Sequence, residues 1–282
     1  MKYCRFMRGG LVRYGRVEEH GGRLEIAALT EAPEEDPGFK LQQMVAAKLD
    51  STGRGIEFEP MPLSEADLLP PVTPSKIICV GRNYREHVKE MGNEVPSEPL
   101  LFFKPPSSLL GAAGAVRLPA ISERVDYEGE LALVIGRRTH KMRRGDSWRE
   151  VVRGFTLAND ISARDLQQRD SQWTRAKGFD TFCPVGPLVS NELDLDAGVT
   201  IETRVNGELR QHASTLDFIF PIPVLLSYIS SVFTLLPGDL ILTGTPAGVG
   251  PLRAGDSVEV SIPGLGVLRN TIAAEEDRGR IQ

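Results

Sequence analysis

Cysteine is scarce in this chain, and its hydrophobic runs are short. The 282 residues include three cysteines, Cys4, Cys79 and Cys183, which lie far apart in the sequence. This spacing excludes a disulfide framework and a site built from thiolate ligands, and it favours a reducing cytoplasm. No apolar run reaches the ~18 residues of a membrane-spanning helix, and the first ten residues lack the apolar core of a secretory signal. We therefore expect a cytoplasmic protein with no membrane partner.

Charged residues of one sign are also not clustered in the sequence. The formal net charge is −5, and the composition, with 41% hydrophobic and 25% charged residues, is typical of a globular protein. Binding to nucleic acid or to an anionic membrane requires clustered Lys and Arg. A basic run at residues 137–144 has no interleaved aromatic side chains and lies in an expected loop. We therefore expect no nucleic-acid partner.

The length allows one large domain, or a small domain attached to a larger one. Glycine-punctuated strand patterns near the N-terminus precede a predicted helix at residues 41–49. Five prolines then fall within residues 60–74, which predicts an extended linker and not a packed element. We predict a small N-terminal domain with its Pro-rich linker over residues 1–72 and a catalytic domain over residues 73–282.

The second of these domains contains many short strand patterns and few helical ones. Residues 200–209 alternate into an Asn-Gly pair, a strong hairpin signal. One helix is predicted at residues 83–92, with Asn83 as the N-cap and Gly92 as the stop. The apolar stretch 223–237 predicts a core helix. These patterns indicate a β-rich α+β fold.

Acidic residues occupy alternate positions in the strand-like segment D-Y-E-G-E-L-A-L-V-I-G, residues 126–136. Positions two apart on a strand share a face, so Glu128 and Glu130 are expected roughly 7 Å apart, from a rise of about 3.3 Å per residue. Two buried like charges are costly without a partner, and a divalent cation between them would remove that cost. A solvated strand face is the alternative.

Asp160 favours the metal interpretation. It follows the apolar run at residues 154–158, a strand-end position from which a third carboxylate can join the first two. Three carboxylates without a Cys or His pattern select a hard cation, namely Mg²⁺, with Mn²⁺ or Ca²⁺ as alternatives. Three protein ligands also leave coordination positions open for substrate or water.

Six ordered blocks of the sequence resemble the fumarylacetoacetate hydrolase family over residues 74–270. They are V-G-R-N-Y-R-E-H-V-K-E, F-F-K-P-P-S-S-L, D-Y-E-G-E-L-A-L-V-I-G, N-D-I-S-A-R-D-L-Q, A-K-G-F-D-T-F-C-P-V-G-P and L-T-G-T-P-A-G-V-G. The resemblance implies a mixed β-sandwich roll as the catalytic domain, a small N-terminal domain and a homodimer.

The same resemblance implies a role for each candidate site residue. The metal ligands would be Glu128, Glu130 and Asp160; the catalytic residues His87, Glu90 and Lys177; and the substrate-binding residues Gln167 and Thr245. Arg82 departs from the aliphatic residue that we associate with its position in many members. It either binds a substrate carboxylate or faces solvent.

The residue types allow these roles without requiring them. His87 and Glu90 are three apart, so a helix places them on one face, where the carboxylate can orient the imidazole as a general base. A surface pair is the alternative. Lys177 can stabilise developing negative charge, or it lies in solvent. Asp126 is expected to be a strand-start or hydrogen-bonding acid, and structural pairing is expected for Arg164 and Asp165.

The function that these features predict is hydrolysis of a carbon–carbon bond in a 2,4-dioxo acid of the acylpyruvate or fumarylpyruvate type. His87 with Glu90 would activate water, and the metal with Lys177 would hold the pyruvate enolate. The same enolate serves isomerisation or tautomerisation of 2-hydroxydienedioates and decarboxylation of oxaloacetate, which are the alternatives. A cation-binding β-rich scaffold is the non-enzymatic alternative, and it would not need the three catalytic residues together.

Overall fold

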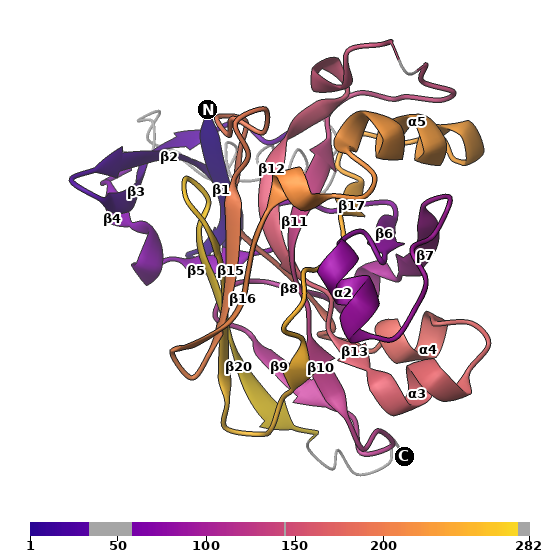
Figure 1. Ribbon diagram of the computed structural model, residues 1–282. Coiled ribbons are helices and arrows are strands. Elements are labelled where there is room, and N and C mark those ends of the chain that lie inside the picture. The colour runs from indigo at the N-terminus through magenta and orange to yellow at the C-terminus, as the bar shows by residue number, and fades with distance from the viewer. Residues whose placement is uncertain (34–57, 144, 276–282) are drawn as a thin grey trace, which may run out of the picture.

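The computed structural model describes residues 1–33, 58–143 and 145–275, in which short strands predominate (Figure 1). The helix predicted at residues 41–49 lies outside the described residues. The longest described helix, α5 (Ile222–Val232), has 11 residues. Over the described ranges, no helix has both the length and the apolar character needed to cross a membrane. The β-rich α+β fold predicted from the sequence is confirmed.

The largest sheet has twelve strands. Its order is β4-β3-β2-β1-β14-β12-β11-β17-β6-β7, with β5 beside β1 and β8 beside β14. Its strands are β1 (Lys2–Arg8), β2 (Leu11–His20), β3 (Arg23–Thr30), β4 (Met61–Pro62), β5 (Asp67–Leu69), β6 (Ile77–Gly81), β7 (Leu100–Lys104), β8 (Leu109–Leu110), β11 (Gly129–Ile135), β12 (Val152–Asn159), β14 (Cys183–Ser190) and β17 (Leu240–Leu242). All seven residues of β11 are buried, which explains its nearly continuous apolar sequence.

Two smaller sheets complete the body. The five-stranded sheet has the order β16 (Glu208–Ser214), β15 (Thr200–Val205), β19 (Ser257–Ile262), β20 (Gly266–Ala274) and β9 (Ala115–Leu118). The three-stranded sheet has the order β13 (Ser162–Ala163), β10 (Val125–Tyr127) and β18 (Gly250–Pro251). Alternate residues of β15 and β19 are buried. One hydrophobic cluster joins Leu131 and Leu133 of β11 to Val260 and Ile262 of β19, so the two larger sheets pack as a sandwich.

The helices are short and lie at the edges of the sheets. Besides α5, they are α2 (Arg85–Glu90), α3 (Arg164–Arg169) and α4 (Thr174–Lys177), with single 3₁₀ turns at Leu63–Glu65, Pro106–Ser108, Trp148–Glu150 and Thr215–Asp217. Figure 1 shows α2, α3 and α4 on the same side of the molecule, beyond the ends of the central strands. This grouping brings the segments that follow β6, β12 and β13 toward one another.

Two turn predictions from the sequence are confirmed. The Asn206-Gly207 pair joins β15 to β16, and both residues have positive φ, as a tight two-residue hairpin turn requires. Gly92 follows α2 with a φ of +66°, and its N–H donates to the Lys89 carbonyl at 3.0 Å. Glycine ends a helix in this way because it has no Cβ to clash in the left-handed conformation. The apolar stretch predicted as a core helix forms α5.

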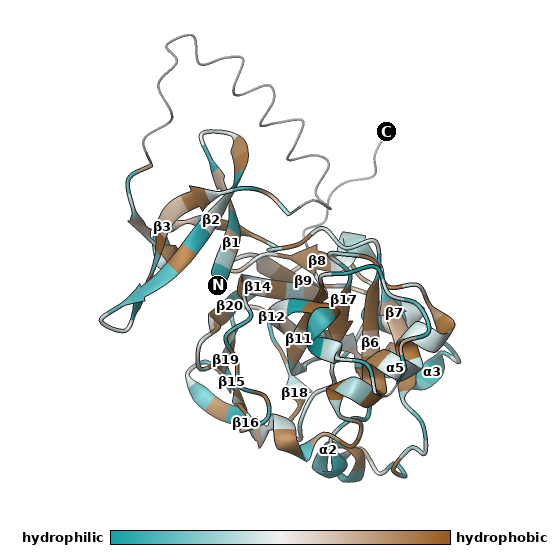
Figure 2. Ribbon diagram, turned by 90° about the horizontal axis from the view of Figure 1, so that it is seen from above, coloured by the Kyte–Doolittle hydropathy of each residue, from teal (hydrophilic) through white to brown (hydrophobic). Residues whose placement is uncertain are grey.

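The Pro-rich stretch is packed, which corrects the prediction of an extended linker. Within it, β4 pairs with β3 and β5 pairs with β1, and Leu63 is buried in the same cluster as Phe6. Proline is compatible with short strands at a sheet edge, where a missing N–H removes no necessary bond. Figure 2 shows β1, β2 and β3 projecting to one side of the body. A domain boundary near residue 72 stays a prediction.

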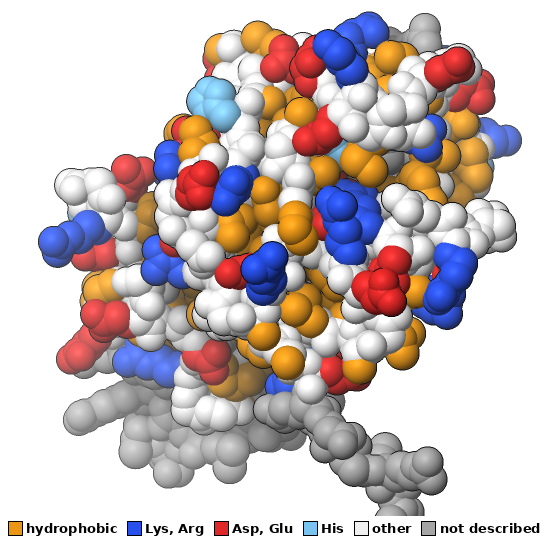
Figure 3. Space-filling model, turned by 60° about the horizontal axis from the view of Figure 1, so that its bottom comes forward, with side chains coloured by type: hydrophobic (Ala, Val, Ile, Leu, Met, Phe, Trp, Pro, Cys, Tyr) orange, Lys and Arg blue, Asp and Glu red, His pale blue; other side chains and the backbone are white. Residues whose placement is uncertain are grey.

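Acidic and basic side chains alternate over the surface in view in Figure 3, where Lys and Arg are interspersed with Asp and Glu among apolar side chains. No broad basic patch occupies that face. A mixed distribution of this kind produces no extended field of one sign. The expectation that nucleic acid is not a partner stays a prediction.

Candidate active site

The two glutamates of the predicted metal site lie where the chain passes from one sheet to another. β10 belongs to the three-stranded sheet and ends at Tyr127, whereas β11 belongs to the large sheet and begins at Gly129. Glu128 forms the link, and Glu130 is the second residue of β11. The sequence had predicted one continuous strand, and this prediction is wrong. The break at Glu128 could not be seen in the local sequence, because the alternation of acidic and other residues continues from β10 into β11. Asp160 directly follows β12, as predicted.

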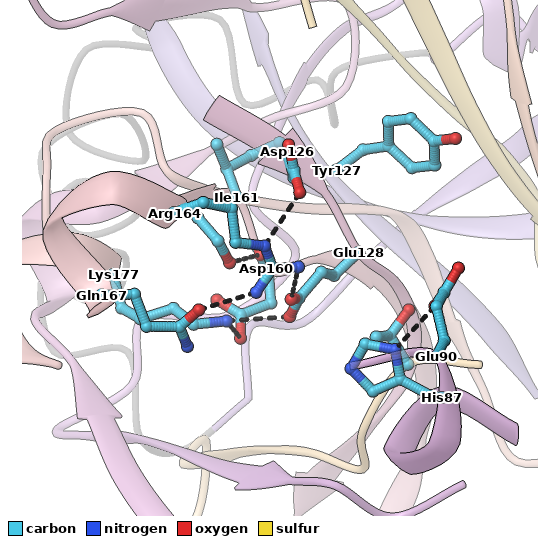
Figure 4. A network of polar contacts seen from close by, with 12 residues as sticks. His87, Glu90, Asp126, Tyr127, Glu128, Asp160, Ile161, Arg164, Gln167 and Lys177 are labelled. Atoms are coloured by element: carbon cyan, nitrogen blue, oxygen red, sulfur yellow. Dashed lines mark hydrogen bonds and ion pairs between the residues drawn. The ribbon is translucent and has the colours of Figure 1, made fainter. Parts of the chain in front are cut away.

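The three carboxylates converge, and two of them, Glu128 and Asp160, are labelled in Figure 4. Each offers one oxygen atom, and these atoms lie within 4.8 Å of one another. Glu128, Glu130 and Asp160 are 4%, 2% and 1% exposed, which excludes the solvated strand face. Backbone hydrogen bonds fix the arrangement, since Asp160 N donates to the Glu128 carbonyl at 2.8 Å and Glu128 N donates to Asn159 Oδ1 at 2.9 Å.

Lys177 lies against two of these carboxylates, not in solvent. Its Nζ donates to Glu128 Oε2 at 2.8 Å and to Asp160 Oδ2 at 2.6 Å. Burial by itself would lower the pKa of Lys177, but the charges of Asp160 and Glu128 outweigh it and raise that pKa above its usual value. The side chain is therefore a charged ammonium group, as an oxyanion-stabilising role requires.

Two further cations lie against these carboxylates; sequence reasoning expected a structural pair for Arg164 and did not single out Lys104. Lys104 Nζ donates to Asp160 Oδ1 at 2.6 Å, and Arg164 donates to Glu128 Oε1 and, at 2.9 Å, to Asp126 Oδ2. Both residues occur in the family-like blocks, which were the available signal. The structural pairing expected for Arg164 is confirmed, and Asp126 is a hydrogen-bonding acid, as predicted. Asp165 makes its own bond, accepting from Ser122 Oγ at 2.6 Å, and does not pair with Arg164.

Glu130 differs from its two neighbours. Its carboxylate accepts a hydrogen bond from Gly244 N at 2.6 Å, and no Lys or Arg of the described residues forms an ion pair with it. Burial, followed by the negative charges of Asp160 and Glu128, raises the pKa of Glu130 well above its ordinary value. A hard divalent cation would supply the missing positive charge, and a set of three carboxylate oxygens suits Mg²⁺ or Mn²⁺. The residues present therefore fit the implied cation.

The predicted dyad is formed on α2. His87 Nδ1 and Glu90 Oε2 lie 3.2 Å apart, and Glu90 Oε1 accepts a hydrogen bond from Gly248 N at 3.0 Å. A carboxylate accepts hydrogen bonds, so Nδ1 carries the proton of a neutral imidazole and Nε2 presents a lone pair. His87 is 6% exposed, which excludes a simple surface pair.

One cavity of about 270 Å³ joins the dyad to the carboxylates. Of the nine predicted site residues, all but Glu90 line it, namely Arg82, His87, Glu128, Glu130, Asp160, Gln167, Lys177 and Thr245. Phe102 and Trp173 form an apolar part of the wall. Glu90 lies behind His87, where it can act on the imidazole but not on a ligand in the cavity.

Gln167 and Thr245 have partners of their own. Gln167 Oε1 accepts from Arg164 Nη1 at 2.8 Å, which leaves its amide N–H groups for a ligand. The Thr245 hydroxyl donates to the Gly129 carbonyl at 2.9 Å and accepts from Gln211 Nε2 at 2.8 Å. Its proton is thus in use, and Thr245 can offer a ligand only its remaining lone pair.

Asn83 anchors the segment between β6 and α2, and it is not the N-cap that the sequence predicted. The N-cap is Tyr84, without a side-chain hydrogen bond. The Asn83 side chain is completely buried; it donates to the Thr243 carbonyl at 2.8 Å and accepts from Phe220 N at 2.8 Å. These bonds tie the segment to the loop that carries Thr245. The preceding residue, Arg82, has a φ of +58°, a conformation that is strained for a residue with a Cβ.

Comparisons with known proteins agree with this site. Residues 76–273 match the family described as "Fumarylacetoacetate (FAA) hydrolase C-terminal", and residues 1–71 match "Rv2993c-like, N-terminal". The chain is 43% identical over 224 residues to the oxaloacetate tautomerase YisK of Bacillus subtilis, a match that covers 74% of each chain.

Two solved structures extend the comparison. A 5-carboxymethyl-2-hydroxymuconate delta-isomerase from Mycobacterium smegmatis has a TM-score of 0.81 and 38% identity, covering 98% of this chain and 100% of its own. A fumarylpyruvate hydrolase from Pseudomonas aeruginosa, in complex with Mn²⁺ and pyruvate, has a TM-score of 0.68 and 32% identity, covering 74% and 92%. This chain is a member of the fumarylacetoacetate hydrolase family of enzymes.

Proposed function

We propose that this enzyme moves a proton at the carbon next to the 2-oxo group of a small 2-oxo dicarboxylic acid, interconverting its keto and enol forms. The observation that carries the proposal is that the His87 imidazole, which pairs with Glu90, lines the same cavity as the three carboxylates and the Lys177 ammonium. The tautomerase relative supports this choice over hydrolysis, which the sequence had placed first.

The three carboxylates would hold the divalent cation, for which we propose Mg²⁺ or Mn²⁺. Bound there, the cation would act as a Lewis acid toward the 2-oxo group and the neighbouring carboxylate of the substrate. The chain itself contributes binding, orientation and proton transfer. Burial of the whole group in a cavity of about 270 Å³ restricts the site to small acids.

In this reaction His87 transfers the proton, and Lys177 stabilises the developing negative charge. His87 Nε2 accepts the proton from C3 while Glu90 stabilises the resulting imidazolium through Nδ1. Lys177 donates a hydrogen bond to the oxygen on which negative charge develops. Returning one proton to that oxygen yields the enol, so one C–H bond is broken, one O–H bond is formed and no redox partner is needed.

Arg82, Gln167 and Thr245 are proposed to hold the substrate. Arg82 lines the cavity, and its guanidinium forms no ion pair or hydrogen bond with another residue of the described ranges. A guanidinium in that position is suited to the second carboxylate of a dicarboxylic acid. Gln167 would donate from its amide, and Thr245 would accept through its remaining lone pair.

The test follows the enol of oxaloacetate, whose conjugated carbon–carbon double bond absorbs in the ultraviolet while the keto form does not. Freshly dissolved enol-oxaloacetate is mixed with enzyme and Mg²⁺. We expect loss of the enol absorbance faster than the uncatalysed rate, without release of carbon dioxide, and no acceleration by Glu130→Ala. An unchanged rate with wild-type enzyme would contradict tautomerisation, and release of carbon dioxide would instead indicate decarboxylation.

Hydrolysis of a 2,4-dioxo acid is the second candidate. The structural similarity to a fumarylpyruvate hydrolase in complex with Mn²⁺ and pyruvate favours it, because the product would bind to a cation held by the carboxylates and to the ammonium of Lys177. His87 would then deprotonate water instead of carbon. Acetylpyruvate is the substrate to use: metal-dependent appearance of pyruvate and acetate would establish hydrolysis. The homodimer and the cytoplasmic location stay predictions, and size-exclusion chromatography with light scattering checks the first.

A further inference from the structure

Asp160 is held by two lysines, one on each carboxylate oxygen. Lys104 Nζ donates to Oδ1 at 2.6 Å, and Lys177 Nζ donates to Oδ2 at 2.6 Å. The two lysines come from different parts of the fold, Lys104 from the end of β7 and Lys177 from the end of α4. Both carry one positive charge in direct contact with the same carboxylate, yet their surroundings differ.

Lys177 faces the cavity, whereas Lys104 does not line it. Lys177 also contacts Glu128, and its Nζ lies 4.9 Å from the centre of the Phe102 ring, another part of the cavity wall. The Lys104 side chain is 0% exposed, and its second hydrogen bond goes to the Ile161 carbonyl at 3.1 Å. Lys104 therefore contacts the carboxylate of Asp160 and the backbone next to it, and no ligand in the cavity can reach it.

A carboxylate with one oxygen fixed in this way cannot rotate to exchange its two oxygens. The Lys104 bonds hold Oδ1 away from the cavity and turn Oδ2 toward Glu128 and Lys177. We propose that Lys104 is a positioning residue that presents Asp160 to the divalent cation as a one-oxygen ligand, while Lys177 acts on the substrate. The inference rests on the proposed function in one respect: Asp160 must bind the cation.

The two lysines form a matched pair for an experiment. Replacing either one by methionine removes one positive charge next to Asp160, and this loss of repulsion favours binding of a cation. Replacement of Lys104 also releases Oδ1, the oxygen held away from the cavity, whereas replacement of Lys177 frees Oδ2, the oxygen that would bind the cation. Removing a hydrogen-bonding partner behind a metal ligand typically costs about 10–100-fold in affinity. The two variants should therefore change metal affinity in opposite directions.

The measurement is titration with Mn²⁺ alone, following free Mn²⁺ by electron paramagnetic resonance. We expect Lys104→Met to bind Mn²⁺ about 10–100-fold more weakly than wild type, and Lys177→Met to bind at least as tightly as wild type. At saturating Mn²⁺, turnover by Lys104→Met should recover toward the wild-type rate. That of Lys177→Met should stay low, because its ammonium acts on the substrate itself.

Lys104→Gln is the second variant, in case loss of a buried charge prevents folding. Its amide can still donate to Asp160 Oδ1, so we expect Mn²⁺ affinity between those of wild type and Lys104→Met, with circular dichroism confirming the fold. Wild-type affinity in Lys104→Met would overturn the inference, and so would failure of both variants to fold, which would mark Lys104 as a residue needed for the fold. Undiminished Mn²⁺ binding by Glu130→Ala would instead contradict the proposed cation site.

Discussion

The two walls of the cavity differ in the interactions that hold their side chains in place. On one wall, two of the three carboxylates, Glu128 and Asp160, form ion pairs with Lys177, Lys104 and Arg164, and all of these side chains are nearly inaccessible to solvent. On the other, His87 pairs with Glu90, whose side chain is 32% exposed, and a single hydrogen bond from Gly248 N joins this dyad to the neighbouring loop. The first wall is held by buried ion pairs, whereas the second is held by hydrogen bonds, including those of Asn83 in the segment that leads into α2.

The difference follows from the cost of burying charge. A buried ion that loses its partner is strongly destabilised, so every charge on the first wall constrains the others. A hydrogen bond at the protein surface contributes only about 1 kcal/mol in net terms, so the bond from Gly248 N restrains Glu90 only weakly. We propose that cation binding belongs to the wall of ion pairs and proton transfer to the wall that carries the dyad. Changes to the first wall should alter affinity for the cation, whereas changes to the second should alter rate alone.

The largest expected effect is that of Glu130→Ala. Lewis-acid assistance contributes several kcal/mol to a reaction of this type, and each ~1.4 kcal/mol is tenfold in rate, so we expect a loss on the order of 10,000-fold. Chelation of the wild-type enzyme should produce the same loss, and added Mg²⁺ or Mn²⁺ should reverse it. Activity that survives both treatments would contradict a cation site on this wall.

His87→Ala should lower kcat by about 1,000-fold, within the range for removal of a general acid–base group. Its affinity for Mn²⁺ should stay that of wild type, because the imidazole belongs to the other wall. Glu90→Gln should have a smaller effect, since Glu90 acts through His87 and does not line the cavity. Steady-state kinetics with parallel Mn²⁺ titration checks both, and a large change in affinity would remove the distinction between the walls.

Arg164→Met should destabilise the fold. It leaves Glu128 and Asp126 without the buried guanidinium that they share, and breaking a buried pair in this way costs about 3–5 kcal/mol. Urea unfolding measures the change. The control is Arg175→Met, which breaks the exposed pair with Asp170 and should leave stability nearly unchanged, because solvent screens it. Equal losses in the two variants would argue against a wall held by buried ion pairs.

The smallest expected effect is that of Arg82→Met. A charged hydrogen bond contributes about 1.5–3 kcal/mol when buried, and Arg82 is only half-buried, so we expect KM for oxaloacetate to rise about tenfold with little change in kcat. The control is Arg85→Met, an exposed position on α2 that does not line the cavity. If KM stays unchanged, Arg82 does not bind the second carboxylate of the substrate.

The residues proposed as ligands or bases were recognisable in the sequence, because the chemistry restricts their type and the ordered blocks preserve their order. The residues that hold these side chains in position were not recognisable in the sequence. Lys104 contacts Asp160 across 56 positions, and Asn83 contacts Thr243 across 160. Nothing in the local sequence distinguishes such a lysine from a solvated one, or such an asparagine from a helix cap. The Pro-rich stretch was misread for the same reason, since pairing of β5 with β1 is a long-range contact.

Residue types and their order were thus sufficient for the β-rich fold, the three carboxylates and the His–Glu pair, because alternation, turn residues and donor chemistry are local properties. The sheet change at Glu128, the pairing of Lys104 and Arg164 with the carboxylates, and the joining of both walls in one cavity depend on the packing of distant segments. Burial creates that dependence. A charged side chain is hydrated in the unfolded chain, and it requires a particular partner only once the fold has removed it from water.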